Sequence, residues 1–318
     1  MIKTKRMVTD RSLVSVVMCT FNGERFIDEQ VDSIIKQDYK HIELIVIDDH
    51  SGDSTWAKLN EWKEKFPAIR LFRNEQNIGY NGNFQKAISL ATGDLIAISD
   101  QDDIWLPQKI SRLMQAFTSP GIILAHCRSV RFEEGRLRYS LARLHHHFKG
   151  NDTRKLFMFN QMMGHDMLFR KELVPCILPV PEGMSYDWWI GVVATTVGEV
   201  ASVEEYLVYH RIHGQNNFFS QPGTSEKKKE FDLPDTLQCF LQISTLRSAD
   251  REFLNTFIGL LKRRSNTDHS FDAKLFRFLF QHRRVFFGHK RRWIPEISYV
   301  KSAIRYARKN FSGKGMSI

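Results

Sequence analysis

The sequence predicts an α/β fold with a doubly wound, mostly parallel sheet and a basic helical appendage at its C-terminal end. Short apolar runs typical of buried strands alternate with segments whose apolar residues recur at helical spacing. This alternation is characteristic of parallel sheets that carry helices on both faces. The predicted strands cover residues 13–18, 43–47, 69–72 and 95–98, and the predicted helices cover residues 26–37, 54–66 and 81–91.

Polar residues gather directly after each predicted strand, and the densest group is Asp100-Gln101-Asp102-Asp103. Three carboxylates in four residues repel one another, and a fold tolerates them most easily around a cation. Open α/β sheets bind ligands at the carboxyl ends of their strands. Hard oxygen ligands there suit Mg²⁺ or Mn²⁺ together with substrate phosphates. We therefore expect a metal–diphosphate site, with a solvated acidic turn as the alternative.

Four motifs occur in order along this half of the chain. They are Cys19-Thr20-Phe21-Asn22, Val46-Ile47-Asp48-Asp49-His50-Ser51, Asn77-Ile78-Gly79, and the acidic run followed by Trp105-Leu106-Pro107. Together they resemble the nucleotide-binding half of a family 2 glycosyltransferase with the GT-A fold, closest in wording to bacterial rhamnosyltransferase-like members. The resemblance is clearest over residues 13–118 and continues to about residue 217. It implies a GT-A domain over residues 1–226, with a nucleotide-binding half at 13–118 and an acceptor half at 119–226, followed by the appendage at 227–318.

The resemblance implies inverting, metal-dependent transfer of a sugar from a nucleoside-diphosphate sugar to a saccharide acceptor. The expected donor is dTDP-rhamnose or a UDP-hexose. The expected acceptor is lipid-linked and belongs to bacterial surface polysaccharide assembly, such as that of O-antigen.

The resemblance also places donor-binding residues along this edge of the sheet. Phe21 is expected to stack on the nucleotide base beside Thr20, and Asp49 is expected to accept a hydrogen bond from that base. Asp48 is expected to hold the ribose or to orient its loop. The full predicted donor set is Thr20, Phe21, Asn22, Asp48, Asp49, Asn77, Gly79, Asn83, Asp100, Asp103 and Arg211.

A cationic and amide cluster follows a predicted strand at residues 206–210. The run Arg211-Ile212-His213-Gly214-Gln215-Asn216 resembles the Y-R-x-H-G-x-N run of the rhamnosyltransferase-like members, with His210 where they have Tyr. Arg211 and His213 are expected to face the donor diphosphate or its metal. The expected ligands of Mg²⁺ or Mn²⁺ are Asp102, Asp100 and His213. A solvated loop after an edge strand is the alternative.

The acceptor side is predicted around Asp187, in the first turn of a helix that opens at Ser185. An acidic residue there is favoured by the helix dipole, which alone would explain it. The resemblance implies that Asp187 is the general base that takes the proton of the acceptor hydroxyl. Trp188 and Trp189 would desolvate the carboxylate and raise its pKa, and they are expected to form a platform for the acceptor sugar.

Two other classes of protein stay open. A nucleotidyltransferase would typically carry a glycine- and base-rich loop after its first strand, where this chain has Cys19-Thr20-Phe21-Asn22-Gly23-Glu24. A non-catalytic nucleotide-sugar binding module could have kept the pocket and lost turnover. The presence of both Asp102 and Asp187 argues against that module.

The charge of the chain lies almost entirely in the appendage. The net charge is +10; residues 227–318 hold 20 Lys and Arg against 8 Asp and Glu, and residues 1–226 hold 26 against 28. Aromatic and basic residues interleave over 271–293, which favours a helix on an anionic membrane surface. A packed appendage with a solvated basic face is the alternative. No nucleic-acid motif accompanies the charge, so we expect no nucleic-acid partner.

The expected location is the cytoplasm, peripheral on the inner face of the cytoplasmic membrane. Residues 1–12 are polar and basic, without the apolar segment of a signal peptide. No apolar run is long enough to cross a bilayer. The four cysteines are widely spaced and fit reduced thiols rather than a metal site.

Overall fold

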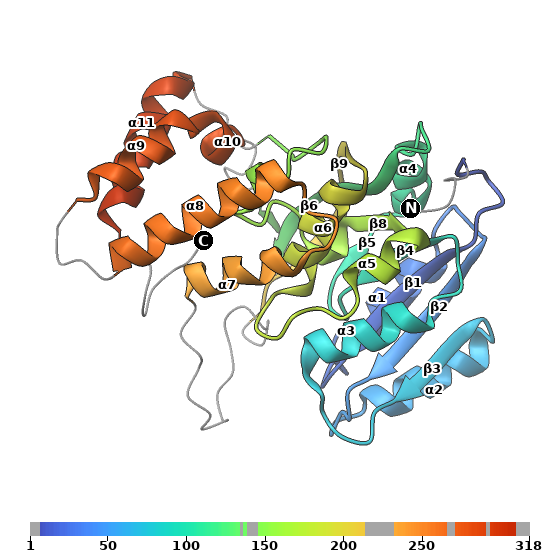
Figure 1. The fold of residues 1–318 in the computed structure, drawn as a ribbon. Coiled ribbons are helices and arrows are strands. Elements are labelled where there is room, and N and C mark those ends of the chain that lie inside the picture. The colour runs from blue at the N-terminus through green and yellow to red at the C-terminus, as the bar shows by residue number, and fades with distance from the viewer. Residues whose placement is uncertain are drawn as a thin grey trace.

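The computed structural model describes residues 7–133, 136–138, 146–213, 232–265, 271–290 and 293–309. Within these residues a nine-stranded sheet has the order β3-β2-β1-β4-β8-β6-β9-β5, and β7 pairs with β6 at its side (Figure 1). The strands are β1 (Val14–Thr20), β2 (Ile42–Asp48), β3 (Ile69–Arg73), β4 (Leu95–Ser99), β5 (Ile104–Trp105), β6 (Ile122–Glu133), β7 (Arg136–Arg138), β8 (Met167–Arg170) and β9 (Glu199–Arg211).

The first four strands are parallel, as predicted. β1 pairs with β2 on one side and β4 on the other, and β2 pairs with β3. The register sets Thr20 opposite Asp48 and Met18 opposite Ser99, so the loops after β1, β2 and β4 meet at one edge of the sheet. Strands β1, β2 and β4 run slightly beyond the predicted apolar runs, because backbone pairing continues into their polar ends.

Helices cover both faces of the sheet, which confirms the doubly wound prediction. One core cluster joins β1, β2 and β4 to α1, α2 and α4, and the other joins the opposite face of these strands to α3, α5 and α6. Alternation along β1 divides its side chains, since Val16 belongs to the first cluster and Val17 to the second. These helices are α1 (Ile27–Ile35), α2 (Thr55–Lys65), α3 (Gly79–Leu90), α4 (Lys109–Gln115), α5 (Val174–Ile177) and α6 (Tyr186–Val197).

The second half of the sheet is mixed in direction. β8 runs antiparallel to β4 and β6, whereas β9 is parallel to β6 and antiparallel to β5. A short 3₁₀ helix, η3 (Gly164–Asp166), leads directly into β8. Because β8 lies beside β4, η3 reaches the loop after β4, and β9 brings its own C-terminal end to β5.

The C-terminal appendage is helical, as predicted, and packs against the sheet domain. Its helices are α7 (Leu233–Cys239), α8 (Ser248–Ser265), α9 (Ala273–Gln281), α10 (Arg283–Phe287) and α11 (Pro295–Arg308). Buried side chains from all five belong to the same core cluster as α3 and α6. Phe286 and Phe287 are fully buried there and Phe278 is half-buried, so these three aromatics of the 271–293 segment are not free to enter a membrane. Among the described helices none is both long and apolar enough to span a bilayer.

Candidate active site

One side-chain amide ties the loop after β4 to the loop after β1. Gln101 accepts a hydrogen bond from the Phe21 backbone N–H at 2.8 Å and donates one to the Phe21 carbonyl at 3.1 Å. Gly23 allows this approach, because a Cβ there would lie 2.4 Å from Gln101 Oε1. The Phe21 side chain remains exposed, at 46%, and this leaves the ring open for the predicted stacking on a base.

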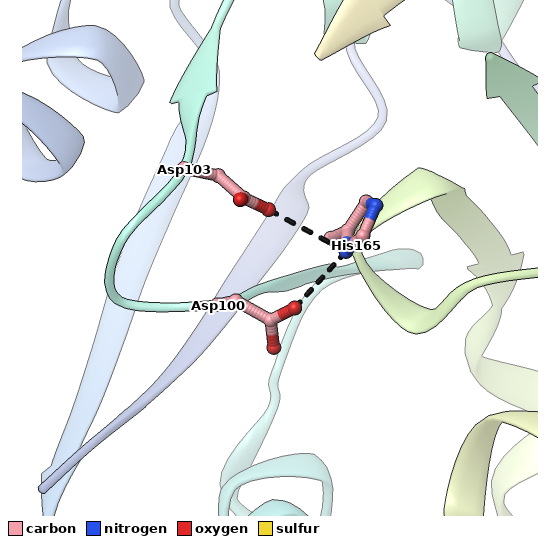
Figure 2. Close-up of side chains that lie close together, drawn as sticks. All are labelled: Asp100, Asp103 and His165. Atoms are coloured by element: carbon pink, nitrogen blue, oxygen red, sulfur yellow. Dashed lines mark hydrogen bonds and ion pairs between the residues drawn. The ribbon is translucent and has the colours of Figure 1, made fainter. Parts of the chain in front are cut away.

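Asp100 and Asp103, from the loop after β4, form a compact cluster with His165 from η3 (Figure 2). His165 Nδ1 lies 3.0 Å from Asp100 Oδ2 and 3.4 Å from Asp103 Oδ2. The other ring nitrogen, Nε2, lies 3.2 Å from Ser129 Oγ. The buried ammonium of Lys109 donates to the His165 carbonyl at 2.7 Å. η3 thereby holds the imidazole between the two carboxylates.

Burial and mutual charge set the protonation of this cluster. Burial opposes a charge on His165, yet Asp103, Asp166 and Asp100 together raise the pKa of the imidazole to about 10. Burial raises the pKa of Asp103 well above its ordinary value. Burial also opposes ionisation of Asp100, but the hydrogen bond and charge of His165 lower its pKa. Burial and the His165 charge lower the pKa of the adjacent His210 to about 3. At neutral pH the cluster therefore holds an imidazolium, and His210 stays neutral.

A second acid–histidine pair lies on the other side of the acidic run. Asp102 Oδ2 and His213 Nε2 are 2.8 Å apart, and their side chains are 13% and 14% exposed. Arg211 fixes the pair to the run, because its backbone N–H donates to Asp103 Oδ1 at 3.1 Å and its Nε donates to the Asp102 carbonyl at 2.8 Å. The structure thus brings Asp102, Arg211 and His213 together, as predicted. Gly214, Gln215 and Asn216 lie outside the described residues.

Two sets of side chains could hold a divalent ion. Carboxylate oxygens and the imidazole nitrogen of Asp100, Asp103 and His165 lie within 4.8 Å of one another, and Asp103 Oδ2 is buried without a hydrogen-bond partner among the described residues. Asp102 and His213 are largely buried, with side chains 13% and 14% exposed, and their 2.8 Å separation matches the spacing of about 3 Å between neighbouring ligands of one octahedral ion. Asp100, predicted to join Asp102 and His213, lies instead beside His165 and Asp103, with its side chain 35% exposed. The structure therefore offers two alternative ligand sets.

Asp187 is buried in the first turn of α6, and its pKa is raised above the ordinary value of an aspartate. Its Oδ1 accepts hydrogen bonds from the Ser185 hydroxyl and, at 2.7 Å, from the Trp188 backbone N–H. Burial raises the pKa of Asp187 and the negative charge of Asp100 raises it further. Burial, then Asp100 and Asp187, raise the pKa of Tyr186. Asp187 and the acidic run therefore share one electrostatic environment.

The prediction of an indole platform for the acceptor does not fit the structure. Trp188 and Trp189 are each only 4% exposed. Their Nε1 atoms donate to the carbonyls of Leu156 and Ile177 at 2.7 and 2.9 Å, and both rings contact Phe240 of the appendage. Apolar contact with the appendage buries them, so they are core residues that anchor α6 behind Asp187.

Asp48 and its neighbours orient the loops of the predicted nucleotide site. The fully buried Asp48 carboxylate accepts from Thr20 Oγ1 at 3.1 Å and pairs with Arg73 Nε at 3.2 Å. Two roles are predicted for Asp48, holding the ribose and orienting its loop. These contacts agree with the second role. Asn22 adopts a positive φ of 49° and accepts from the Gly52 N–H at 2.9 Å, which links the loops after β1 and β2.

Asp49 holds the start of α3. Its carboxylate accepts from the Gly79 N–H at 2.9 Å and from the Asn74 side chain at 2.7 Å. Asn77 Oδ1 also accepts from Gly79, whose φ of +77° favours glycine. Asn83 is 1% exposed and accepts from Asn74 at 3.1 Å. These residues shape the wall of the site, and their direct contacts with a donor stay predictions.

Sequence reasoning assigned no role to Gln101, Lys109 or His165. Gln101 lies within the acidic motif, and its position was a usable signal. Lys109 lies next to apolar Ile110, and a lone base in an apolar helix face indicates a buried charge with partners. His165 could not be placed, because only the insertion of β8 beside β4 brings it to Asp100.

The comparison with known proteins identifies the family to which this chain belongs. A model of the family described as Glycosyl transferase family 2 matches residues 15–178. The chain belongs to glycosyl transferase family 2, and it is a glycosyltransferase. This match excludes the nucleotidyltransferase alternative. The finer resemblance to rhamnosyltransferase-like members stays a prediction.

Relatives and solved structures agree with this family. An uncharacterised glycosyltransferase of Methanocaldococcus jannaschii is 29% identical over 220 residues, covering 67% of this chain and 75% of that protein. The Escherichia coli UDP-Glc:α-D-GlcNAc-diphosphoundecaprenol β-1,3-glucosyltransferase WfgD is 39% identical over 101 residues, or 32% of this chain and 39% of that enzyme. The structure of S. aureus TarS 1-349 in complex with UDP-GlcNAc aligns with a TM-score of 0.57 at 15% identity, covering 93% of this chain and 91% of that one. That likeness confirms the GT-A fold.

Proposed function

We propose that this glycosyltransferase transfers a hexose from a UDP-sugar to a lipid-diphosphate-linked saccharide, with inversion at the anomeric carbon. The observation that carries the proposal is the buried Asp187 carboxylate, whose pKa is raised by burial and by the charge of Asp100. A base and an acidic diphosphate site within one electrostatic environment are what glycosyl transfer requires.

Asp187 acts as the general base. The acceptor hydroxyl attacks the anomeric carbon of the donor while the Asp187 carboxylate takes its proton, and the bond from that carbon to the diphosphate oxygen breaks with its electron pair. Attack from the face opposite the leaving group inverts the configuration. The hydrogen bonds from Ser185 and Trp188 hold the carboxylate in the orientation that this proton transfer needs.

The leaving diphosphate lies against the acidic run. Asp102 and His213 would hold Mg²⁺ or Mn²⁺, which would neutralise charge on the departing diphosphate. Arg211 fixes the acidic run by donating hydrogen bonds to the Asp103 carboxylate and to the Asp102 carbonyl. The exposed ring of Phe21 stacks on the uracil, and Gln101 fixes its backbone.

The donor and acceptor are proposed from the relatives. The E. coli relative is named for a UDP-glucose donor and a diphosphoundecaprenol-linked acceptor, and the TarS structure holds UDP-GlcNAc. UDP-glucose is therefore the first donor to test, with dTDP-rhamnose as the competing one. A lipid-linked acceptor would hold the enzyme peripherally at the inner face of the cytoplasmic membrane, in assembly of a surface polysaccharide.

The test is a transfer assay with purified full chain, Mn²⁺ and a GlcNAc-diphosphate-lipid acceptor, using UDP-glucose, UDP-GlcNAc and dTDP-rhamnose in turn. We expect transfer from a UDP-sugar and a β-linked product by NMR. Donor binding without transfer to any saccharide would favour the non-catalytic module. A product of retained configuration would exclude Asp187 as the base of a single displacement.

A further inference from the structure

Large apolar side chains are exposed on α9 and α11 and directly before each of these helices. Trp293 is 101% exposed, Ile294 61%, Ile297 51%, Phe280 40% and Phe271 37%. All five lie between residues 271 and 297, whereas the opposite face of the same helices is well packed. The exposure therefore belongs to one surface of a folded unit.

These side chains fall into two groups, one at α9 and one at the start of α11, which the contacts of Arg283 connect. The ring of Phe271 contacts Phe276 at 5.5 Å, and Phe276 stacks on Phe280 at 5.8 Å. The Arg283 guanidinium lies 4.7 Å from the Phe280 ring and pairs with Glu296 at 2.7 Å. Glu296 lies between Trp293 and Ile297 in sequence, at the start of α11. We name the five exposed residues, Phe271, Phe280, Trp293, Ile294 and Ile297, the α9–α11 stripe.

Basic side chains surround this stripe. Residues 271–290 and 293–309 contain nine Lys and Arg against two Asp and Glu. Arg277 is exposed and lies three residues from Phe280 on the same face of α9. The Arg284 side chain is 79% exposed and shares Glu296 with Arg283. An apolar stripe rimmed by cations complements an anionic bilayer, where bases meet head groups and aromatic rings enter the interface.

The stripe is held rigidly by the packing behind it. Leu275, Leu279, Phe286 and Phe287 are fully buried in the core that continues to α6. α9, α10 and α11 lie at the end of the molecule remote from β1, β2 and β3 (Figure 1). A surface contact there would leave the nucleotide-binding loops uncovered.

We propose that the α9–α11 stripe docks this enzyme on an anionic bilayer, with Trp293, Ile294 and Ile297 inserted and Arg277, Arg283 and Arg284 on the head groups. The proposal rests on the proposed function in one respect only, that a lipid-linked acceptor gives the docking its purpose. The sequence predicts that the aromatics of residues 271–293 face a membrane. The docking proposal keeps only those that are exposed in the fold.

The test is co-sedimentation of the full chain with phosphatidylcholine vesicles, with and without phosphatidylglycerol. The wild type should bind only the anionic vesicles, and less at high salt. The pair Trp293→Ser and Ile297→Ser should lower partition at least about tenfold. The pair Arg277→Gln and Arg284→Gln should lower it roughly fivefold per arginine. Met7→Ser, at 52% exposure, and the exposed Lys63→Gln are matched controls that should bind normally.

Three results would overturn the docking proposal. They are equal binding to neutral vesicles, binding that the stripe variants leave intact, and a concentration-dependent dimer that these variants dissolve. Transfer to a water-soluble acceptor analogue, measured without vesicles, separates the two proposals. Normal soluble transfer without vesicle binding defeats the docking alone, and vesicle binding without soluble transfer defeats the proposed function alone.

Discussion

Neighbouring aspartates in the acidic run differ because their surroundings differ. Asp100 pairs with the buried His165, whereas Asp102 faces the partly exposed His213. Asp103 is buried and has a strongly raised pKa. The sequence predicts a ligand site here, but it could not show which partner each of the three carboxylates would have, because these partners come from distant segments. Asp100 is the most exposed of the three, at 35% of its side chain, whereas the Asp102 side chain is 13% exposed.

Asp102→Asn should abolish most turnover while the fold is kept. Loss of a metal-bound diphosphate contact worth several kcal/mol corresponds to a fall in kcat of about 10²-fold or more. Steady-state kinetics at several Mn²⁺ concentrations measures this. Asp235→Asn, at an aspartate whose side chain is 71% exposed on α7, is the control. Wild-type activity in the presence of EDTA would show that the reaction does not need a divalent metal ion.

Ser185→Ala should shift the pH dependence of kcat. The Ser185 hydroxyl donates to Asp187 and lowers its pKa, against the dominant effect of burial. Its removal raises the pKa of Asp187 further, and a base works only when ionised. The acidic limb of the pH–rate profile should therefore move to higher pH. Ser89→Ala, at an exposed serine of α3, should leave the limb in place, and an unmoved limb in Ser185→Ala would count against Asp187.

At the scale of elements, local pattern was sufficient for the first half of the chain. The strands at residues 13–18 and 95–98 and the helix at 26–37 are found close to their predicted bounds. In each segment the spacing of the apolar residues already indicates which side chains are buried. The neighbour of β4 could not be predicted, since β8 has only four residues and pairs with strands far away in sequence. The position of Gln101 in the acidic motif indicates a role, but its partner could not be predicted, because the Phe21 backbone lies 80 residues away in sequence.

Gly23→Ala should impair catalysis more than stability. The new Cβ would meet Gln101 Oε1 at 2.4 Å, so the flexible amide must move and release the Phe21 backbone. A displacement of this size at a positioning contact can lower kcat/KM by about tenfold or more. Gly52→Ala is a matched control, because nothing lies within 4 Å of its Cβ position. Equal kinetics for the two variants would show that the hydrogen bonds between Gln101 and the Phe21 backbone do not support catalysis.

At the scale of the molecule, the appendage and the domain are one packed body. The charge imbalance distinguishes a basic C-terminal segment in the sequence, but composition cannot show that its aromatics divide into a buried and an exposed set. The predicted sugar platform of Trp188 and Trp189 was wrong for the same reason, because the sequence does not show which aromatic side chains are buried. An aromatic pair beside a candidate base suits a sugar platform, and only the presence of Phe240 shows that the pair belongs to the core.

Phe240→Ala should destabilise the whole molecule in one transition. Phe240 is fully buried between the appendage and the indoles of α6. Truncation of a buried phenylalanine costs about 3–5 kcal/mol. Urea unfolding followed by far-UV circular dichroism and by tryptophan fluorescence should give coincident curves, both shifted. Separate transitions, with only one shifted, would show that the appendage folds independently.

The most direct test of the central claim is a paired measurement on Asp187→Asn, with donor Kd from calorimetry and kcat from the transfer assay. If Asp187 is the base that faces the diphosphate site, Kd stays at the wild-type value while kcat falls by roughly 10²–10⁴-fold. Wild-type turnover, or a loss of donor binding equal to the loss of rate, would contradict it.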